Sequence, residues 1–369
     1  GRGGEFRASL REITGAATIP QVFVAGTHVG GATDTFDAFN AGTLQTLLAA
    51  AAGPAVLAQP VKAKRIYGIT WRGPTQVEQG FMDQLGKSGI PIEVTWRDAG
   101  QQAGRIAEFA REIRETRPDL VYTWGTPPTL GIAGPWDKPD PARHVTDIPI
   151  VFALVAAPVA AKLVPALKAQ GRDVTGVYHV AALSAQVEAI RAYRPFGKLG
   201  VIYNAAEPNS LATAEGLKDL AKSRGFAVVE QTFARGADGK PVADGIEDKV
   251  FALKRAGAEW LYLGPDTYLF SQVARIAAPA MEARLPTFSA TEGVLNAPAP
   301  ILAGLVSSYY TIGQFAGHKA AQVLGKGTRA RDIPIETLSR YSFVVRMEVA
   351  KTLGFLPPVS LFNHAVIKS

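Results

Sequence analysis

Short runs of β-branched and aromatic residues alternate with helical patterns along most of this 369-residue chain, and this alternation limits the possible folds more than any other feature. Amphipathic segments such as GRIAEFAREIRETRP separate the runs. The first series comprises RIYGITW (65–71), IEVTWRD (92–98), LVYTWGT (120–126) and IPIVFALV (148–155). Regular alternation of strands and helices predicts a parallel sheet with helices on both faces.

A second series of the same kind follows. It comprises KLGVIYN (198–204), FAVVEQTF (226–233), EWLYLGP (259–265) and LPTFSA (285–290). Two consecutive sheets of similar size predict two lobes, joined through DVTGVYHV and crossed again by ILAGLVSSYYTIG and TLSRYSFVVRM. Several crossings between lobes form a hinge rather than a linker. We expect lobe 1 to comprise 62–176 plus about 291–320, and lobe 2 to comprise 177–290 plus about 321–369.

Composition and motifs exclude several classes of function. The net charge of +7 arises from 39 Lys and Arg against 32 Asp and Glu, and the basic residues are scattered singly, which argues against nucleic-acid binding. The absence of cysteine excludes disulfides, thiolate metal sites and thiol catalysis. Apolar runs end well before the length of a membrane span. The five histidines are isolated, and GxSxG, HExxH and P-loop motifs are missing, so we expect no catalytic residue, cofactor or metal.

The candidate ligand-binding residues follow the predicted strands. Ligands of open parallel sheets bind beyond the carboxyl ends of the strands, and two facing lobes place both sets of ends around one cleft. From lobe 1 the candidates are Trp71, Arg72, Gly73, Trp124, Gly125, Thr126, Pro127 and Val155. From lobe 2 they are Asn204, Glu207, Asn209, Ser210, Gly264, Pro265, Asp266, Thr267, Thr291 and Glu292.

These residue types suit capture of a small molecule better than catalysis. Trp71 and Trp124 offer flat apolar faces, backbone N–H groups at helix starts suit a carboxylate, and Asp266 or Glu207 could meet an ammonium group. A zwitterionic or aromatic acid would satisfy both ends. The alternative is structural, because Asn, Ser and Asp at strand ends commonly cap the next helix, and the two tryptophans could pack within the lobes.

The opening segment has a different pattern. QVFVAG predicts a strand, THVGG a turn that pairs back, and TFDAFNAGTLQTLLAAA a helical region. Together these residues resemble the C-terminal half of a glutaredoxin over about 9–52. The resemblance implies a cis Ile19–Pro20 bond and glutathione-site positions at Ile19, Pro20, Thr33 and Asp34.

The catalytic Cys motif of that family lies in an upstream half that has no counterpart here. We therefore expect 1–57 to be a partial thioredoxin-like fragment without redox activity. A fusion remnant, a vestigial glutathione site and a partner-docking module are the interpretations of this fragment.

The main body resembles a known family of binding proteins. DLVYTWGTPPTLGIAG, IPIVFALVAAPVAAKLV, GRDVTGVYHV, LGVIYNAAEPNS and IPIETLSRYSFVVRMEVAKTLG resemble the ABC-transporter substrate-binding proteins that include tryptophan- and phenylalanine-binding members. The resemblance covers about 62–369. It implies a type I periplasmic-binding fold, α/β with two doubly wound parallel sheets joined by a hinge, and partners comprising a permease with a separate ATPase subunit.

One segment departs from the family. PPTLGIAGPWDKPDPARHVTD carries five prolines and Trp136 where the family has a short helix, and we expect this segment to form a lid over the cleft.

Three hypotheses of function follow. The first is the solute-binding component of an importer, periplasmic or exported, although LQTLLAAAAGPAVLAQP follows acidic residues where a signal peptide is basic. The others are a ligand-sensing module for a regulatory partner and a two-lobed enzyme.

Overall fold

The computed structural model describes residues 12–15, 21–51, 62–168 and 171–368. The chain forms two units, Gly1–Lys62 and Ala63–Ser369, and each is described by itself. The expected cis bond at Ile19–Pro20 lies outside the described residues.

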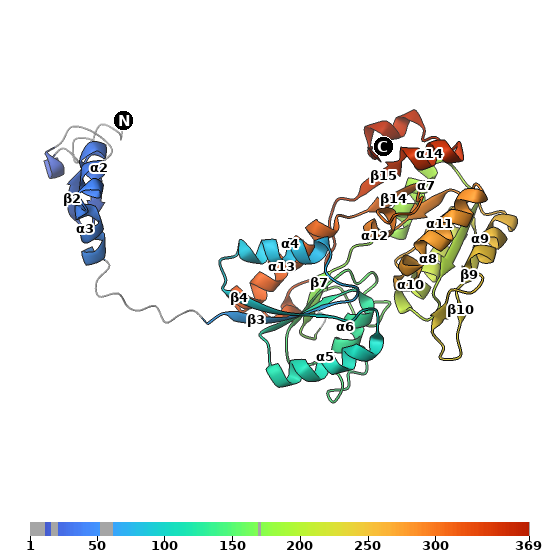
Figure 1. Cartoon of the computed structure of the whole chain (residues 1–369), viewed down its shortest axis with the longest axis horizontal. Coiled ribbons are helices and arrows are strands. Elements are labelled where there is room, and N and C mark those ends of the chain that lie inside the picture. Colours follow the sequence, from blue (N-terminus) through green and yellow to red (C-terminus); the bar gives the residue numbers. More distant parts are fainter. Residues whose placement is uncertain (1–11, 16–20, 52–61, 169–170, 369) are drawn as a thin grey trace. The chain divides into compact units, whose positions relative to one another are not determined.

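The first unit is small and has almost no interior. Strands β1 (Val22–Val24) and β2 (Thr27–Gly30) pair antiparallel, and helices α2 (Ala32–Asn40) and α3 (Thr43–Ala51) follow (Figure 1). The Asp34 carboxylate accepts a hydrogen bond from the Gly31 N–H at 2.8 Å, so it caps α2. Phe36 is 64% and Phe39 56% exposed, and none of the α2 side chains is buried. The described residues of this unit, 12–15 and 21–51, therefore form no apolar core.

The first sheet of the second unit is parallel throughout. Its strands are β3 (Lys64–Thr70), β4 (Ile92–Asp98), β5 (Leu120–Trp124), β6 (Ile150–Ala153) and β7 (Val174–Val177), in the order β4-β3-β5-β6-β7. The two strands β5 and β6 are buried along their whole length. This confirms the predicted doubly wound α/β layer, with one strand more than the sequence runs indicated.

Helices cover both faces of this sheet. Helices α4 (Gln76–Gly86) and α13 (Tyr309–Lys326) pack side by side on one face, while α5 (Ala103–Thr116) and α6 (Thr126–Ala133) lie on the other (Figure 1). A Cβ at Gly313 would lie 1.9 Å from the Val77 carbonyl oxygen, and one at Gly80 would lie 2.0 Å from the Tyr310 carbonyl oxygen. The two helix backbones therefore touch, which only glycine permits at these positions.

The second sheet is larger and mixed. It contains β8 (Lys198–Tyr203), β9 (Ala227–Thr232), β12 (Trp260–Leu263), β13 (Thr287–Ser289), β14 (Ala303–Val306), β15 (Ser342–Arg346) and β16 (Ala365–Lys368), in the order β16-β15-β14-β13-β12-β8-β9. Strand β15 runs antiparallel to β14. The first four strands match the predicted series, whereas β14 to β16 come from the chain that we expected to return to lobe 1 or to extend lobe 2.

Two helical layers enclose this second sheet. Helices α7 (Leu183–Tyr193), α8 (Pro208–Arg224) and α14 (Met347–Leu353) contribute to one apolar cluster. Helices α9 (Ile246–Arg255), α10 (Thr267–Ser271), α11 (Val273–Glu282) and α12 (Glu292–Leu295) contribute to the other. A hairpin of β10 (Ala234–Arg235) and β11 (Pro241–Val242) projects from the end of β9. Short 3-10 turns, Ala330–Asp332 and Val359–Asn363, complete the chain.

Three segments of the described chain pass between the two sheets, at 178–182, 307–308 and 337–341. Hydrogen bonds join the first of these segments to the other two. The Ser307 hydroxyl donates to the His179 carbonyl at 2.7 Å, and the Tyr341 hydroxyl donates to the Val180 carbonyl at 3.4 Å. Residues 303–306 belong to the second sheet, because β14 pairs with β13. The chain therefore returns to lobe 1 near Tyr309, whereas we expected it to return at about 291. This second part of lobe 1 extends to Glu336, which pairs with Val177, whereas we expected it to end near 320.

The expected lid over the cleft is wrong. The first part of the proline-containing segment is helix α6, which begins with Pro127 and Pro128 in its first turn, where proline fits a helix. Trp136 instead lines a cavity together with Ile148 and Val174, which precede or begin β6 and β7. These strand starts lie at the edge of the sheet opposite the carboxyl ends, so Trp136 faces away from the predicted site.

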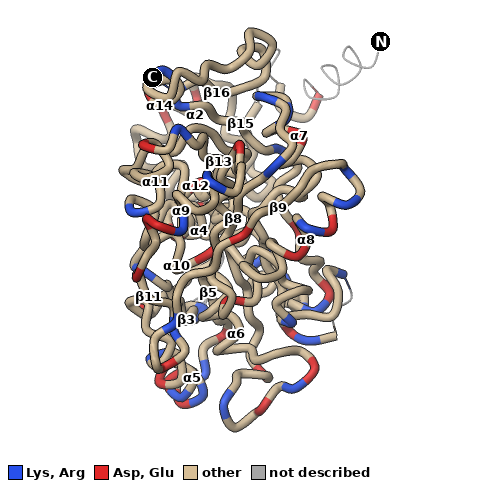
Figure 2. The backbone as a smooth tube through the Cα atoms, turned by 90° about the vertical axis from the view of Figure 1, so that its right-hand side faces the viewer, with Lys and Arg blue, Asp and Glu red and all other residues tan. Residues whose placement is uncertain are grey.

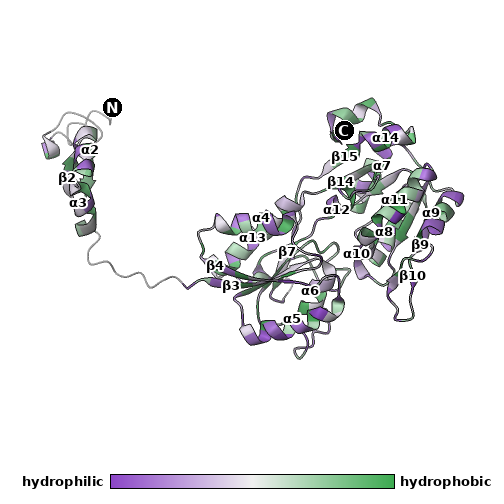
Figure 3. Cartoon of the chain, viewed as in Figure 1, coloured by the Kyte–Doolittle hydropathy of each residue, from purple (hydrophilic) through white to green (hydrophobic). Residues whose placement is uncertain are grey.

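The surface carries mixed charge. Lys and Arg positions are interspersed with Asp and Glu positions along the backbone in the view of Figure 2, and Figure 3 shows apolar strands and helices of mixed hydropathy. Among the described residues, no helix is long and apolar enough to span a membrane.

Candidate ligand-binding site

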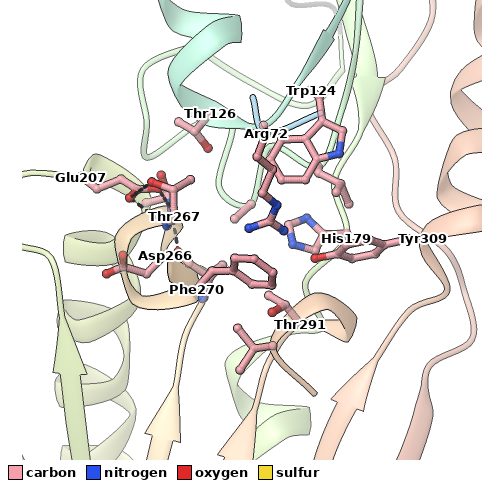
Figure 4. A pocket seen from close by; sticks show the side chains of 16 residues that line it. Arg72, Trp124, Thr126, His179, Glu207, Asp266, Thr267, Phe270, Thr291 and Tyr309 are labelled. Carbon is pink, nitrogen blue, oxygen red and sulfur yellow. Dashed lines mark hydrogen bonds between the residues drawn. The ribbon is translucent and has the colours of Figure 1, made fainter. Parts of the chain in front are cut away.

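The carboxyl ends of strands from both sheets meet at one pocket of the second unit. Its lining includes the ends of β5 and β6, the starts of α8 and α10, and residues of two hinge segments (Figure 4). We call it the inner pocket, lined by Arg72, Trp124, Gly125, Thr126, Leu154, Ala156, His179, Glu207, Asn209, Pro265, Asp266, Thr267, Phe270, Thr291, Val294 and Tyr309. The space left between these side chains is about 40 Å³, enough for about three waters.

Arg72 brings a partly buried cation into the inner pocket. Its guanidinium carbon lies 3.3 Å from the centre of the Phe270 ring and 4.8 Å from the Trp124 ring, so aromatic faces of both lobes contact the cation. Burial lowers the pKa of Arg72, and the neighbouring Tyr309 partly offsets this effect. Among the described residues, no carboxylate oxygen lies within 4.0 Å of the guanidinium. A desolvated charge without an opposite charge is costly, so the guanidinium favours an anionic partner.

The turn after β3 positions this arginine. Asp98, at the end of β4, accepts hydrogen bonds from the Thr70 hydroxyl at 2.9 Å and the Gly73 N–H at 2.8 Å. Gly73 has a φ of +80°, which a residue with a side chain rarely adopts. The predicted site residue Gly73 therefore shapes the turn and does not line the pocket.

Two further polar groups beside Arg72 have no partner. Trp124 Nε1 and His179 Nδ1 are buried and make no hydrogen bond with any described residue. Burial, together with the positive charge of Arg72, lowers the pKa of His179 to about 3, so its imidazole is neutral at physiological pH. Buried polar atoms are nearly always hydrogen-bonded, and atoms left without a partner mark places where a ligand or water belongs.

On the lobe 2 side, Glu207 and Asn209 form an acceptor pair. Glu207 Oε2 accepts from the Thr267 N–H at 3.0 Å and the Thr267 hydroxyl at 2.6 Å, while Oε1 accepts only from Asn209 Nδ2, at 3.1 Å. Asn209 Nδ2 also donates to the Pro265 carbonyl at 2.6 Å, which leaves Asn209 Oδ1 buried and without a donor. Among the described residues, no Lys or Arg nitrogen lies within 4.0 Å of Glu207.

Asp266 has a structural role as the cap of α10. Its Oδ1 accepts from the Leu269 N–H at 2.8 Å, and its Oδ2 accepts from the Asn204 N–H at 2.6 Å and from the Ser210 hydroxyl. Burial raises the pKa of both Asp266 and Glu207. Because the Asp266 oxygens already have donors from the protein, Glu207 and Asn209 are the better partners for a ligand cation.

A wider outer chamber adjoins the inner pocket and shares Thr126, Glu207 and Thr267 with it. Its volume is about 950 Å³. The lining combines apolar and polar side chains: Trp71, Pro127, Leu130, Pro208, Pro241 and Tyr268 with Gln101, Gln102, Arg105, Glu108, Asn204, Asp238 and Lys240. The turn of the β10–β11 hairpin faces the start of α5 across this chamber.

The structure brings most of the predicted residues together. The inner pocket contains Arg72, Trp124, Gly125, Thr126, Glu207, Asn209, Pro265, Asp266, Thr267 and Thr291. The outer chamber contains Trp71, Pro127 and Asn204. Gly73, Val155, Ser210, Gly264 and Glu292 line neither cavity. Val155 is fully buried in the lobe 1 core, and Glu292 accepts a hydrogen bond at 2.6 Å from the Tyr309 N–H at the start of α13.

Sequence reasoning missed His179, Phe270 and Tyr309. His179 lies in the first hinge segment and Tyr309 directly after the second, whereas the prediction used strand ends alone. Phe270 lies in the short helix α10, four positions after its cap. The aromatic residues next to the predicted crossings were the signal that could have found Tyr309.

A family model agrees with this geometry. The model described as "ABC transporter substrate binding protein" matches residues 71–366. The chain belongs to this family. It therefore has the two-lobed periplasmic-binding fold of a substrate-binding component of an ABC transporter.

Individual proteins are similar to this chain over most of its length. A tyrosine-binding protein of Clostridioides difficile is 26% identical over 300 residues, which are 80% of this chain and 81% of that protein. A conserved domain protein from Vibrio cholerae has a TM-score of 0.72 at 23% identity, over 84% of this chain and all of the other. A Streptococcus pneumoniae domain in complex with L-Trp has a TM-score of 0.71 at 22% identity, over 83% and 99%. At these identities the structures establish the fold.

The first unit matches glutaredoxins over a short stretch. Glutaredoxin-C4 of Arabidopsis thaliana is 48% identical over 46 residues, which are 12% of this chain and 34% of that protein. The chain thus spans about a third of the length of these relatives. Among the described residues, no group of three or more His, Cys, Asp or Glu is arranged to hold a metal ion.

Proposed function

We propose that this protein captures a small organic solute, an amino acid or an aromatic carboxylate, in the inner pocket and delivers it to an ABC importer. The observation that carries the proposal is that Trp124 Nε1, His179 Nδ1 and Asn209 Oδ1 are buried without partners and all line one pocket between the lobes. The names of two relatives, a tyrosine-binding protein and a domain in complex with L-Trp, support this ligand class.

Both lobes contribute to the pocket, so ligand contacts are complete only when the lobes are closed. A ligand that contacts Arg72 on one side and Glu207 on the other would shift the hinge toward the closed state. The partners in this proposal are a membrane permease and a separate ATPase subunit, and the protein works outside the cytoplasm. Hydrolysis of ATP is assigned to the partner, since this chain carries no phosphate-binding loop motif.

A binding screen tests the proposal. The melting temperature of the full chain is measured with each of the proteinogenic amino acids and with a set of aromatic carboxylates. The affinity and stoichiometry of each compound that raises it are then measured by isothermal titration calorimetry. We expect at least one compound to raise the melting temperature and to bind at one site per chain. Stoichiometric binding without turnover distinguishes a binding protein from an enzyme.

A pair of tryptophan variants locates the site. Trp124→Phe removes the unpartnered Nε1–H and keeps an aromatic ring, so we expect about three- to tenfold weaker binding of the hit. Trp136→Phe is the matched control, because Trp136 lies away from the cleft. Equal affinities in the wild type and both variants would remove Trp124 from the site.

A further inference from the structure

The inner pocket has opposite polarity at its two ends. At the lobe 1 side lie the Arg72 guanidinium and Trp124 Nε1, which are donors only. At the lobe 2 side lie Glu207 Oε1 and Asn209 Oδ1, which are acceptors. Figure 4 shows Arg72 directed toward Phe270 and Tyr309, with Glu207 and Thr267 on the other side of the pocket.

Neither end has an opposite charge in direct contact among the described residues, and the charge of the more distant Glu78 offsets the burial of Arg72 only in part. Among the described residues, Arg72 has no carboxylate and Glu207 no Lys or Arg within 4.0 Å. The orientation of the Asn209 amide is fixed, because its nitrogen donates to both Glu207 and the Pro265 carbonyl. An ammonium group supplies the donors that Glu207 and Asn209 lack, and a carboxylate supplies the charge that Arg72 lacks.

Space limits what can lie between these ends. The inner pocket leaves about 40 Å³, which suits a small head group and not an aromatic ring. The face of Phe270 is already covered by the Arg72 guanidinium at 3.3 Å. The outer chamber, by contrast, offers about 950 Å³ and opens next to Glu207, not next to Arg72.

We propose that the inner pocket binds only the backbone groups of one free amino acid, with its carboxylate at Arg72 and its ammonium at Glu207 and Asn209, while its side chain extends into the outer chamber. This deepens the proposed function and rests on it. The chamber is larger than one aromatic side chain requires and includes the apolar faces of Trp71 and Tyr268. The ligand class is therefore α-amino acids with long or substituted side chains.

A ligand series tests the proposal on the full chain. Tyrosine, O-benzyltyrosine, N-acetyltyrosine and tyrosinamide are titrated by calorimetry at pH 7.5. Tyrosine and O-benzyltyrosine bind with similar affinity, because the benzyl group enters the outer chamber. N-acetyltyrosine loses the ammonium and tyrosinamide loses the carboxylate, so each binds about ten- to a hundredfold more weakly.

Each result against this pattern has a separate meaning. Equal binding of tyrosine and either blocked derivative overturns the assignment of the two ends. Loss of binding only for O-benzyltyrosine overturns the direction of the side chain. Binding of aromatic carboxylates without any amino acid also overturns the inference, although the proposed capture of solutes survives. The absence of any ligand in the whole screen removes the proposed function itself.

Variants connect each end to its residue. Arg72→Gln abolishes the difference between tyrosine and tyrosinamide, and Glu207→Gln abolishes the difference between tyrosine and N-acetyltyrosine. Loss of a residue that only supports the fold would lower the affinities for all four ligands by the same factor. The measurement that decides is therefore the ratio of the affinity for tyrosine to the affinity for each blocked derivative, compared within each variant. Arg255→Gln and Glu282→Gln, at exposed positions outside both cavities, are the controls and keep both differences.

Discussion

His179 lies in the first hinge segment and lines the inner pocket. Its carbonyl accepts a hydrogen bond from Ser307 in the second hinge segment, and its ring lies edge-on to Tyr309, with ring centres 6.0 Å apart. The imidazole is 5% exposed and faces the positive charge of Arg72. Protonation of His179 would therefore place a second positive charge in the same buried region, which disfavours the folded state.

The stability of the protein should therefore depend on pH through His179. The pKa is about 3 in the folded state and about 6.5 when unfolded, so the unfolded state binds more protons between these values. The stabilisation is complete above pH 6.5 and is lost as the pH falls. Relative to His179→Gln, the wild type should lose about 3 kcal/mol between pH 7 and pH 4, measured by urea unfolding.

His318→Gln is the control, because His318 is exposed. It measures how the loss of a surface imidazole changes the free energy of unfolding. Parallel stability curves for the wild type and His179→Gln between pH 7 and pH 4 would contradict the burial of a neutral imidazole.

At the level of single residues, most of the residues predicted by the strand-end rule line the inner pocket or the outer chamber. Arg72, Trp124 and Glu207 could be placed because their strands were readable from the sequence. The role of Asp266 as a helix cap, and the availability of Asn209 instead, depend on which hydrogen bonds are already made. Such partners are not visible in a sequence, where Asp and Asn at strand ends look alike.

At the level of elements, the contact of α4 with α13 ties lobe 1 to the hinge. Helix α13 begins directly after the second crossing segment and packs against α4 through glycines. The Tyr310 hydroxyl donates to the Asp83 carboxylate at 2.7 Å on the same interface. The returning chain is thus held in lobe 1 by a close backbone contact.

Filling this contact should destabilise the protein. In Gly313→Ala the new methyl group would lie 1.9 Å from the Val77 carbonyl oxygen, so the helices must move apart. We expect a loss of about 1–3 kcal/mol in the free energy of unfolding. Gly86→Ala, on the same helix pair with no atom within 4 Å of the new Cβ, should be neutral or stabilising. Equal effects of the two substitutions in urea unfolding would contradict the close contact.

The elements that the sequence did not reveal share a physical cause. Strand β7 lies in a segment interpreted as a connection, β14 directly precedes the second hinge segment, and β15 and β16 follow the third. Their place in a sheet depends on which strand each one pairs with, as β14 does with β13 and β15 does with β14. Local patterns indicate that a run is β-rich, but they do not say to which of two sheets it belongs.

At the level of the whole molecule, the chain divides into two compact units, Gly1–Lys62 and Ala63–Ser369. All residues of both cavities lie within 63–369. A chain beginning at Ala63 should therefore bind the ligand with the affinity of the full chain, within about twofold, and unfold at the same temperature. Calorimetry and thermal unfolding on both chains measure this. A large loss of affinity in the shorter chain would give the glutaredoxin-like unit a role in capture.

The central claim is that the solute lies between the lobes, with Arg72 and Glu207 at its two ends. Its most direct test is a crystal structure of residues 63–369 with the amino acid that binds most tightly in the screen. The account predicts a ligand carboxylate at hydrogen-bond distance from the Arg72 guanidinium and a ligand ammonium at the same distance from Glu207. Ligand found elsewhere on the chain, or the two groups in the reverse order, would contradict it.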